Sequence, residues 1–444
     1  MVTLRPRFLD PVDPTTRHNL KVDIFAAAFF AAFFGLTIPF LGPLVIRMGG
    51  SPSLVGLIAA GPFLGLLLAG VWGHLSEGRP KLPYVVVPAL LARLLFLPLA
   101  FTVHPTGFAA LAVLYFLING IQLPAYTALM QRIYPREFRG RLMALVRVVL
   151  GLVQVGALRL AGGLMDQTGH RAPFLAAALL GGAGALVFSR IREPLLPEEE
   201  ENPAPTATSA SPLWSSFQAM RRILNGDRRF ARFELGFMIF GLGNLLLLPV
   251  YTIFQVKTLG LNNSQVAWVT ITWSIAWLWG YLLCGQAVDS FGPRKIVLAG
   301  VGFYALVPLA YLAGHNYLAV LIGSAFLGLG DAAVELGWMN EVISLAPGQV
   351  STYAGIHLSL LGLRGSLAPL LGPYLALAWG TDPVLLLGLG LLLLGLGVLS
   401  EPSFFKTVRE GSYALPSPCT PAIRSLQTAG AGAGRRRRST ALAQ

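Results

Sequence analysis

Two carboxylates interrupt a long apolar stretch of the chain. Asp331 and Glu335 lie four residues apart in "LGLGDAAVELGWMNEV", a spacing that places them on the same face of a helix. Two ionised carboxylates at this distance repel each other, and an apolar environment further disfavours the charged form. One of the two groups should therefore bind a proton near neutral pH. The pair is a candidate proton carrier.

Basic and neutral polar side chains interrupt four other apolar runs. Ionised groups within a bilayer cost roughly 2.5 to 3.5 kcal/mol each on insertion scales, so such residues are candidates for a functional site. Arg364 can neutralise the acid pair or bind an anionic group, and the amides can hydrogen-bond a solute. The alternative is that these side chains satisfy one another between helices. The candidates are His357 and Arg364, Arg147 and Gln154, Asn119, Gln122 and Tyr126, and Asn244.

Three other ionisable residues have simpler interpretations. Asp23 and Glu234 lie in the first turn of their apolar runs, where an acid interacts favourably with the helix dipole. Arg159 is long enough to extend its guanidinium to the membrane interface. We expect structural roles for these residues.

Composition indicates a membrane protein. Of the 444 residues, 55% are hydrophobic and 12% are charged, whereas soluble domains carry about 25% charged residues. Twelve apolar runs reach the roughly 17 to 25 residues that a membrane-spanning helix needs, and none alternates as a β-barrel strand does. The predicted fold class is an all-α membrane protein with twelve transmembrane helices. The runs lie near residues 24–46, 52–73, 83–103, 107–129, 142–165, 173–190, 233–256, 264–285, 295–314, 317–339, 351–378 and 383–400.

The distribution of basic residues predicts the orientation. Of the 33 Lys and Arg residues, 26 lie on one side of the predicted spans, while only Arg47, Arg171 and Lys257 lie in loops on the other side. Because basic loops stay in the cytoplasm, we expect both termini there and an integral protein of the cytoplasmic membrane. The net charge of +13 follows from this topology, so no nucleic-acid partner is expected.

The spans fall into two halves that resemble repeats. Between the sixth and seventh runs, "EPLLPEEEENPAPTATSASP" is acidic and Pro-rich, a composition that cannot bury enough apolar surface to order itself. A parallel repeat of six spans is typical of secondary transporters. Matching pairs are Asp23 and Glu234 (211 residues apart), Glu77 and Asp289 (212), Pro135 and Pro347 (212), and Gly162 and Gly372 (210). The predicted parts are a cytoplasmic N-terminus 1–23, a six-helix bundle 24–192, a cytoplasmic linker 193–232, a second bundle 233–403 and a disordered basic tail 404–444.

The connection between the eighth and ninth spans carries a family motif. Residues 285–295, "GQAVDSFGPRK", resemble the G-x-x-x-D-x-x-G signature and basic pair of the major facilitator superfamily. The matching positions are Gly285, Asp289, Gly292, Arg294 and Lys295.

The equivalent connection in the first half, "GHLSEGRPK", is a weaker copy. It keeps Gly73, Glu77 and Lys81, but Pro80 stands where the second glycine belongs. "YPREFRGR" and "GGLMDQTGHR" resemble the four-five and five-six connections of the same family. With these segments the resemblance covers residues 19–401.

The resemblance implies roles for several of these positions. In the family, this loop is thought to latch the outward-facing state, which assigns the motif residues of both copies to a conformational latch around Asp289 and Glu77. Spans such as the tenth line a central cavity, whereas the third tends to be peripheral, so Arg93 is not expected at the site. Drug–proton antiporters of the family commonly carry an arginine on the fourth span, where this chain has Phe116.

Together these features predict a secondary transporter that moves a small organic solute by alternating access. Proton-coupled efflux is one form that the acid pair would allow, with protons and membrane lipid as further partners and a monomer as the expected state. The alternative is a non-transporting protein of the same fold, acting as a receptor, lipid handler or assembly factor. An enzyme is not expected, because no nucleophile–base pair or metal-ligand spacing occurs, and no cofactor is predicted.

Overall fold

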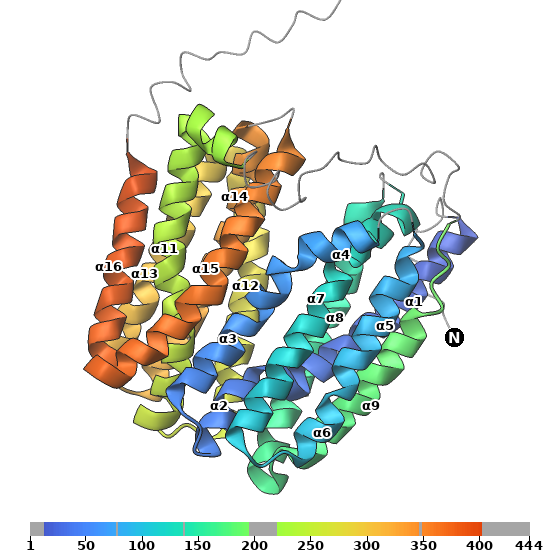
Figure 1. Ribbon diagram of the computed structural model, residues 1–444, viewed down its shortest axis with the longest axis horizontal. Coiled ribbons are helices and arrows are strands. Elements are labelled where there is room, and N and C mark those ends of the chain that lie inside the picture. Colours follow the sequence, from blue (N-terminus) through green and yellow to red (C-terminus); the bar gives the residue numbers. More distant parts are fainter. Residues whose placement is uncertain (1–12, 77–78, 136–137, 195–219, 346–348, 402–444) are drawn as a thin grey trace, which may run out of the picture. The chain divides into compact units, whose positions relative to one another are not determined.

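The computed structural model describes residues 13–76, 79–135, 138–194, 220–345 and 349–401. These residues form helices joined by short connections, with no strand among them (Figure 1). Eleven of the helical segments are long and apolar enough to cross a membrane. The shorter helix α3, which α4 follows after a single residue, completes the twelve predicted spans.

The helices of the first half match the first six predicted runs. They are α1 (Pro14–Thr37), η2 (Ile38–Phe40) and α2 (Leu41–Arg47), α3 (Pro52–Leu67) and α4 (Ala69–Leu75), α5 (Lys81–Leu94) and α6 (Phe96–Phe101), α7 (Pro105–Ile133), α8 (Arg139–Thr168) and α9 (Arg171–Phe188).

The helices of the second half follow in the same manner. They are α11 (Arg228–Ile253) and η4 (Phe254–Thr258), α12 (Asn263–Phe291), α13 (Pro293–Ala313), α14 (Tyr317–Leu345), α15 (Val350–Trp379) and α16 (Thr381–Ser400).

Two helices begin earlier than the apolar runs indicated, and an aspartate at each start explains why. Asp13 accepts hydrogen bonds from the amides of Thr15 and Thr16 at 2.9 and 3.0 Å. Asp227 accepts from the amides of Arg229 and Phe230 at 3.0 Å each. Such N-caps satisfy amides that have no partner within the helix, so α1 and α11 extend into polar sequence.

The most extensive contacts between the two halves are those of α3 with α15 and of α8 with α12. Small residues allow these helices to approach closely. A Cβ atom added at Gly56 of α3 would lie 2.4 Å from the Pro369 carbonyl oxygen, and one at Gly162 of α8 would lie 2.8 Å from the Ser264 Cα. Neither position leaves room for a side chain.

Large apolar side chains on the outer helix faces remain uncovered by protein. Leu152 is 71% exposed and Leu179 is 70% exposed. In water this surface would be unfavourable, so it is suited to contact with lipid.

Candidate functional site

A cavity of about 770 Å³ has walls from both halves of the chain. The first half contributes Phe30 and Asn119, and the second contributes Gln255, Trp273 and Asp331. Most of the remaining wall is apolar or aromatic. A mainly apolar cavity with a few polar groups is typical of small-molecule sites.

Asp331 is the acidic residue in the wall of this central cavity. Its two carboxylate oxygens accept one hydrogen bond each, from the Trp273 indole Nε1 and from the Tyr304 hydroxyl, both at 2.7 Å. Glu335 is exposed and lies beside the Tyr281 hydroxyl. The two acids share α14, but only Asp331 is held by two donors within the helix bundle.

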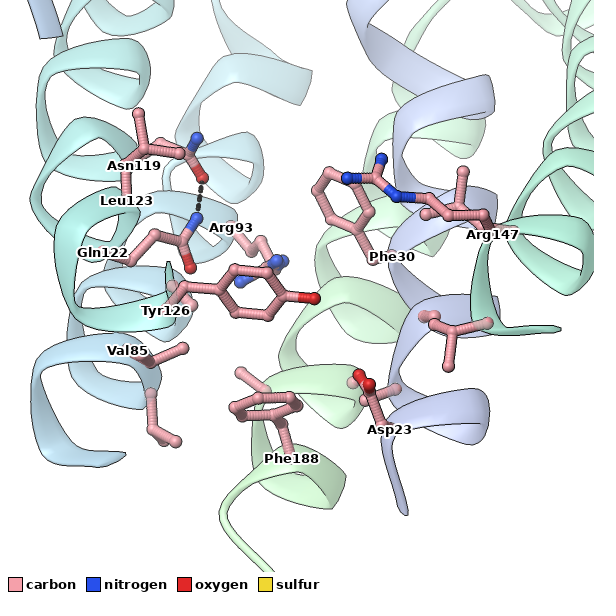
Figure 2. A pocket seen from close by; sticks show the side chains of 18 residues that line it. Asp23, Phe30, Val85, Arg93, Asn119, Gln122, Leu123, Tyr126, Arg147 and Phe188 are labelled. Atoms are coloured by element: carbon pink, nitrogen blue, oxygen red, sulfur yellow. Dashed lines mark hydrogen bonds between the residues drawn. The ribbon is translucent and has the colours of Figure 1, made fainter. Parts of the chain in front are cut away.

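A second cavity, of about 290 Å³, lies among helices of the first half (Figure 2). Its wall includes Asn119, Gln122 and Tyr126 of α7, all predicted site residues, and Gln122 Nε2 donates to Asn119 Oδ1 at 2.5 Å. Phe30, Asn119 and Gln122 belong to the walls of both cavities. The two spaces therefore adjoin each other.

Arg93 forms part of this first-half cavity, contrary to the expectation of a peripheral position. It is 8% exposed, and its guanidinium carbon lies 5.2 Å from the ring centroid of Phe30 and 5.8 Å from that of Phe33. Its NH1 atom has no hydrogen-bond partner in the described part of the chain. The arginine fits because α9 has a glycine there: a Cβ at Gly181 would lie 2.8 Å from Arg93 Cδ.

Asp23 and Arg147 line the same cavity. Asp23 is buried and accepts a hydrogen bond from the Tyr134 hydroxyl at 2.8 Å. Arg147 is exposed to the cavity, and its charge acts on Asp23 electrostatically. Arg147 was a predicted site residue, whereas Asp23 was expected in the first turn of its span with a structural role. Because α1 begins at Pro14, Asp23 lies beyond the first turn, and that expectation is wrong.

The second half buries its charged residues in a different way. His357 Nδ1 lies 3.0 Å from Glu234 Oε1, with both residues no more than 3% exposed, and the imidazole stacks on Trp338 at a centroid distance of 4.4 Å. Arg364 donates to the Phe237 carbonyl oxygen, and its guanidinium lies 5.5 Å from the centroid of that residue's ring. Neither His357 nor Arg364 lies in the wall of the two cavities described above.

The remaining two predicted site residues lie apart from these walls. Gln154 Nε2 donates to Ser274 Oγ at 3.4 Å, which joins α8 to α12. Asn244 is half-buried on α11. The structure thus brings Asn119, Gln122, Tyr126, Arg147 and Asp331 to the two cavities.

Comparison with known proteins identifies the family. The family model of the Major Facilitator Superfamily matches residues 24–251 and 233–431. The chain belongs to this superfamily. Membership supports membrane transport as its activity, and it indicates a transporter rather than an enzyme.

Two proteins that are similar in sequence to this chain are named for different kinds of transport. "Sodium-dependent phosphate transport protein 1, chloroplastic" of Arabidopsis thaliana is 27% identical over 391 residues, covering 80% of this chain and 72% of that protein. "Multidrug resistance protein 2" of Bacillus subtilis (strain 168) is 23% identical over 359 residues, covering 79% and 87%.

Solved structures of transporters have the same fold. The nucleoside transporter NupG superposes with a TM-score of 0.64 at 12% identity, covering 88% of this chain and 99% of that one. The human organic anion transporter MFSD10 (TETRAN) gives 0.61 at 17%, covering 87% and 100%. At these identities the likeness concerns the fold alone.

The structure describes the residues of the second-half superfamily motif except for the side chain of Asp289. Gly292 ends α12 with φ of +84°, a conformation that favours glycine. Arg294 donates from Nε to the Leu399 carbonyl oxygen at 3.1 Å, and Lys295 is exposed. Gly285 has open space around it. The Asp289 side chain lies outside what the structure describes, so its predicted latch contact stays a prediction.

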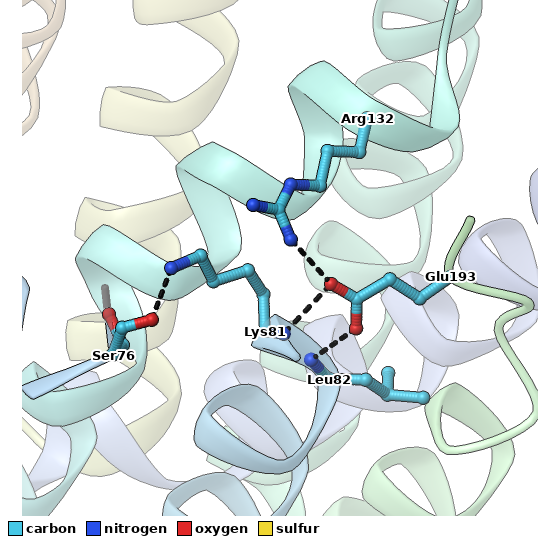
Figure 3. A network of polar contacts seen from close by, with 5 residues as sticks. All are labelled: Ser76, Lys81, Leu82, Arg132 and Glu193. Carbon is cyan, nitrogen blue, oxygen red and sulfur yellow. Dashed lines mark hydrogen bonds and ion pairs between the residues drawn. The ribbon is translucent and has the colours of Figure 1, made fainter. Parts of the chain in front are cut away.

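The first-half copy of the motif makes contacts within its own half (Figure 3). Lys81 Nζ donates to the Ser76 carbonyl oxygen. Glu193 accepts from the amides of Lys81 and Leu82 at 2.8 and 2.9 Å, and it pairs with Arg132 at 3.0 Å.

The other two residues of the first-half motif are Gly73 and Glu77. A Cβ at Gly73 would come no closer than 3.7 Å to Pro124. Glu77 lies outside the described residues, so its latch role also stays a prediction.

A cluster at the start of α12 joins the two halves. Asp166 of α8 accepts from the Asn263 amide and side chain at 2.9 Å each, and from the Ser264 amide and hydroxyl at 2.9 and 2.6 Å. Arg47 donates to the Leu261 carbonyl oxygen at 2.6 Å and also to Asn263 Oδ1. We call Asp166, Arg47, Asn263 and Ser264 the end cluster.

The segment "GGLMDQTGHR", which resembles a family connection, also contains the loop-motif spacing at this cluster. Gly162, Asp166 and Gly169 follow the same G-x-x-x-D-x-x-G spacing as the superfamily loop motif, and Gly169 has φ of +71°.

Proposed function

We propose that this protein is a secondary transporter that moves a small organic solute across the cytoplasmic membrane by alternating access, with both termini in the cytoplasm. One observation carries the proposal: the central cavity is walled by both halves, so a change in their relative tilt changes access to it. A scaffold would need no such shared cavity. The superfamily match supports the same activity.

The end cluster supplies a contact that one tilt makes and the other breaks. Asp166 places a negative charge at the N-terminal end of α12, where the helix dipole favours it. Its four hydrogen bonds cross from one half to the other. We infer that they hold the cavity closed at this end, and that the motif around Asp289 and Glu77 holds the opposite end in the alternate state.

Proton coupling is assigned to the acids of α14. Asp331 lies at the central cavity, where the Trp273 indole and the Tyr304 hydroxyl each donate a hydrogen bond to its carboxylate. A change in tilt changes its access to water and hence its proton affinity. We propose that Asp331, with the exposed Glu335 beside it, exchanges protons during the cycle and that the coupled direction is efflux. The protein acts as a monomer surrounded by lipid.

The test measures access to the central cavity from each side of the membrane. Thr270 lies in the cavity wall, so a Thr270→Cys variant without Cys284 and Cys419 carries one reporter thiol. Vesicles of known orientation are treated with a membrane-impermeant maleimide, with a lipid-facing Leu152→Cys variant as the control. We expect labelling of the Thr270→Cys variant from both sides, at different rates. Labelling from one side only, under every solute condition, would support the non-transporting alternative.

A further inference from the structure

Resting on this proposed function, we propose that the cavity within the first half binds the anionic group of the solute, and that the solute is a small organic carboxylate with an apolar body. Two guanidiniums, those of Arg93 and Arg147, contribute to the wall of this space from different helices. Figure 2 shows Arg93 next to Tyr126 in this view and Arg147 farther away, on the same side of the picture as Asp23.

The charge balance of the cavity favours an anion. The ionisable side chains in its wall are two bases, Arg93 and Arg147, one carboxylic acid, Asp23, and the hydroxyl of Tyr126. Asp23 already accepts a hydrogen bond from Tyr134. With Tyr126 neutral, the wall therefore carries an excess of one positive charge when Asp23 is ionised and of two when it is protonated. A bound monoanion removes all of this excess when Asp23 is ionised and half of it when Asp23 is protonated.

Arg93 has a guanidinium nitrogen, NH1, for which the described residues provide no hydrogen-bond acceptor. It is more than nine-tenths buried, its guanidinium contacts the rings of Phe30 and Phe33, and its NH1 has no hydrogen-bond partner among the described residues. A buried donor without an acceptor costs stability, and a guanidinium fork matches the two oxygens of a carboxylate.

The rest of the wall indicates what kind of molecule carries the anion. Ala26, Phe30, Val85 and Phe188 give the cavity an apolar surface. The volume of about 290 Å³ lies near the lower end of the roughly 300 to 1,000 Å³ usual for ligand pockets. An inorganic anion would leave this apolar surface unused, whereas a small aromatic or aliphatic carboxylate would cover it. The amides of Asn119 and Gln122 remain available for neutral polar groups.

The experiment measures binding of four probes to the purified full chain by isothermal titration calorimetry. Benzoate carries the anion and the apolar body, benzamide has the same shape without the charge, benzylammonium reverses the charge, and inorganic phosphate has charge without the body. The variants are Arg147→Gln, Arg93→Gln and Arg93→Lys, with Arg159→Gln as the matched control. Arg159 is exposed on the same helix as Arg147 and lies outside the cavity wall.

We expect benzoate to bind at least about tenfold more tightly than the other three probes, the factor that loss of one charge-assisted hydrogen bond would produce. Arg147→Gln should lose this preference and Arg159→Gln should keep it. If Arg93→Gln does not fold, Arg93→Lys, which keeps the charge but not the fork, should weaken benzoate several-fold. Equal binding of benzoate and benzamide, or full benzoate affinity in Arg147→Gln, would overturn the proposal, and tightest binding of phosphate would assign the site to an inorganic anion.

The maleimide experiment tests transport, and the calorimetry experiment tests the solute class, so either proposal can be contradicted without the other. If the maleimide test shows two-sided access but benzoate does not bind preferentially, transport stands and the solute class is wrong. If benzoate binds as expected but access is one-sided, the site stands in a protein that does not transport.

Discussion

Arg147 and His357 lie 210 residues apart, and Asp23 and Glu234 lie 211 apart, so the two halves carry an acid and a base at related positions. In the first half, both residues line a cavity and Arg147 is exposed to it. In the second half, both are sealed: His357 contacts Glu234 at 3.0 Å and stacks on Trp338. The acid and the base therefore face a cavity in the first half, whereas in the second half they are buried and contact each other.

This difference indicates how a repeated fold divides its tasks. A buried acid–base contact with good geometry holds helices in one arrangement, and removal of one partner leaves a buried polar group without its hydrogen bond. Charged groups that face a cavity leave part of their hydrogen-bonding capacity to a ligand. We infer that the Glu234 and His357 contact stabilises the second half, while Arg93 and Arg147 in the first half bind the solute.

The largest expected effect is on stability, and it distinguishes the halves. His357→Ala should destabilise the protein by about 3 to 5 kcal/mol, because Glu234 is left buried without its partner. Asp23→Asn should cost less than about 1.5 kcal/mol, because the new amide oxygen can still accept from Tyr134. Thermal unfolding of both variants in the same detergent measures the contrast. Equal losses of stability would mean that Asp23 and Arg147 in the first half also have a structural role.

A second prediction concerns the end cluster. Asp166→Ala removes four hydrogen bonds to a charged group, each worth roughly 1.5 to 3 kcal/mol at most, so labelling of the Thr270→Cys variant from that side of the membrane should rise at least about tenfold. The control is Asp382→Ala, because Asp382 is an exposed acid that contacts His315 at 3.2 Å. Unchanged labelling in Asp166→Ala would show that other contacts close this end.

The third prediction concerns Asp331. Asp331→Asn should abolish the response of solute transport to an imposed pH gradient in liposomes, because the amide cannot bind the proton. Solute exchange without a gradient should stay within about threefold, since the change is isosteric and loses about one hydrogen bond. Glu335→Gln is the matched control and should retain part of the response. Accumulation driven by pH in the Asp331→Asn variant would move the coupling site elsewhere.

The smallest expected effect concerns the loop motifs. Asp289→Asn should slow transport about twofold to threefold more than Glu77→Gln, a difference of under about 1 kcal/mol, because the second-half motif is the fuller copy. Initial rates of solute uptake into liposomes measure both. A larger effect at Glu77 would reverse this assignment.

The fold could be predicted from sequence because membrane spans are governed by length and hydropathy. Asp331 and Arg147 could be found for the same reason, since a charge inside an apolar run is rare and costly. Helix starts were less predictable, because the Asp13 and Asp227 caps extend α1 and α11 beyond the apolar runs.

The composition of the site depended on contacts between distant segments. Arg93 reaches the first-half cavity because Gly181 of α9 leaves space for its stem and α1 supplies the aromatic rings, and no local pattern encodes this. Arg364 looked equivalent in sequence, yet it donates to the backbone carbonyl of Phe237. Its predicted role toward the acid pair or an anionic solute stays a prediction.

The most direct test of the division between the halves is benzoate binding to two variants at repeat-related positions, Arg147→Gln and His357→Gln, measured by calorimetry on folded, purified protein. The glutamine at 357 can still donate to Glu234, so this variant should fold. We expect a loss of about tenfold or more in affinity for Arg147→Gln, corresponding to about 1.4 kcal/mol, and a change of less than about twofold for His357→Gln. Equal losses, or a larger loss at position 357, would contradict it.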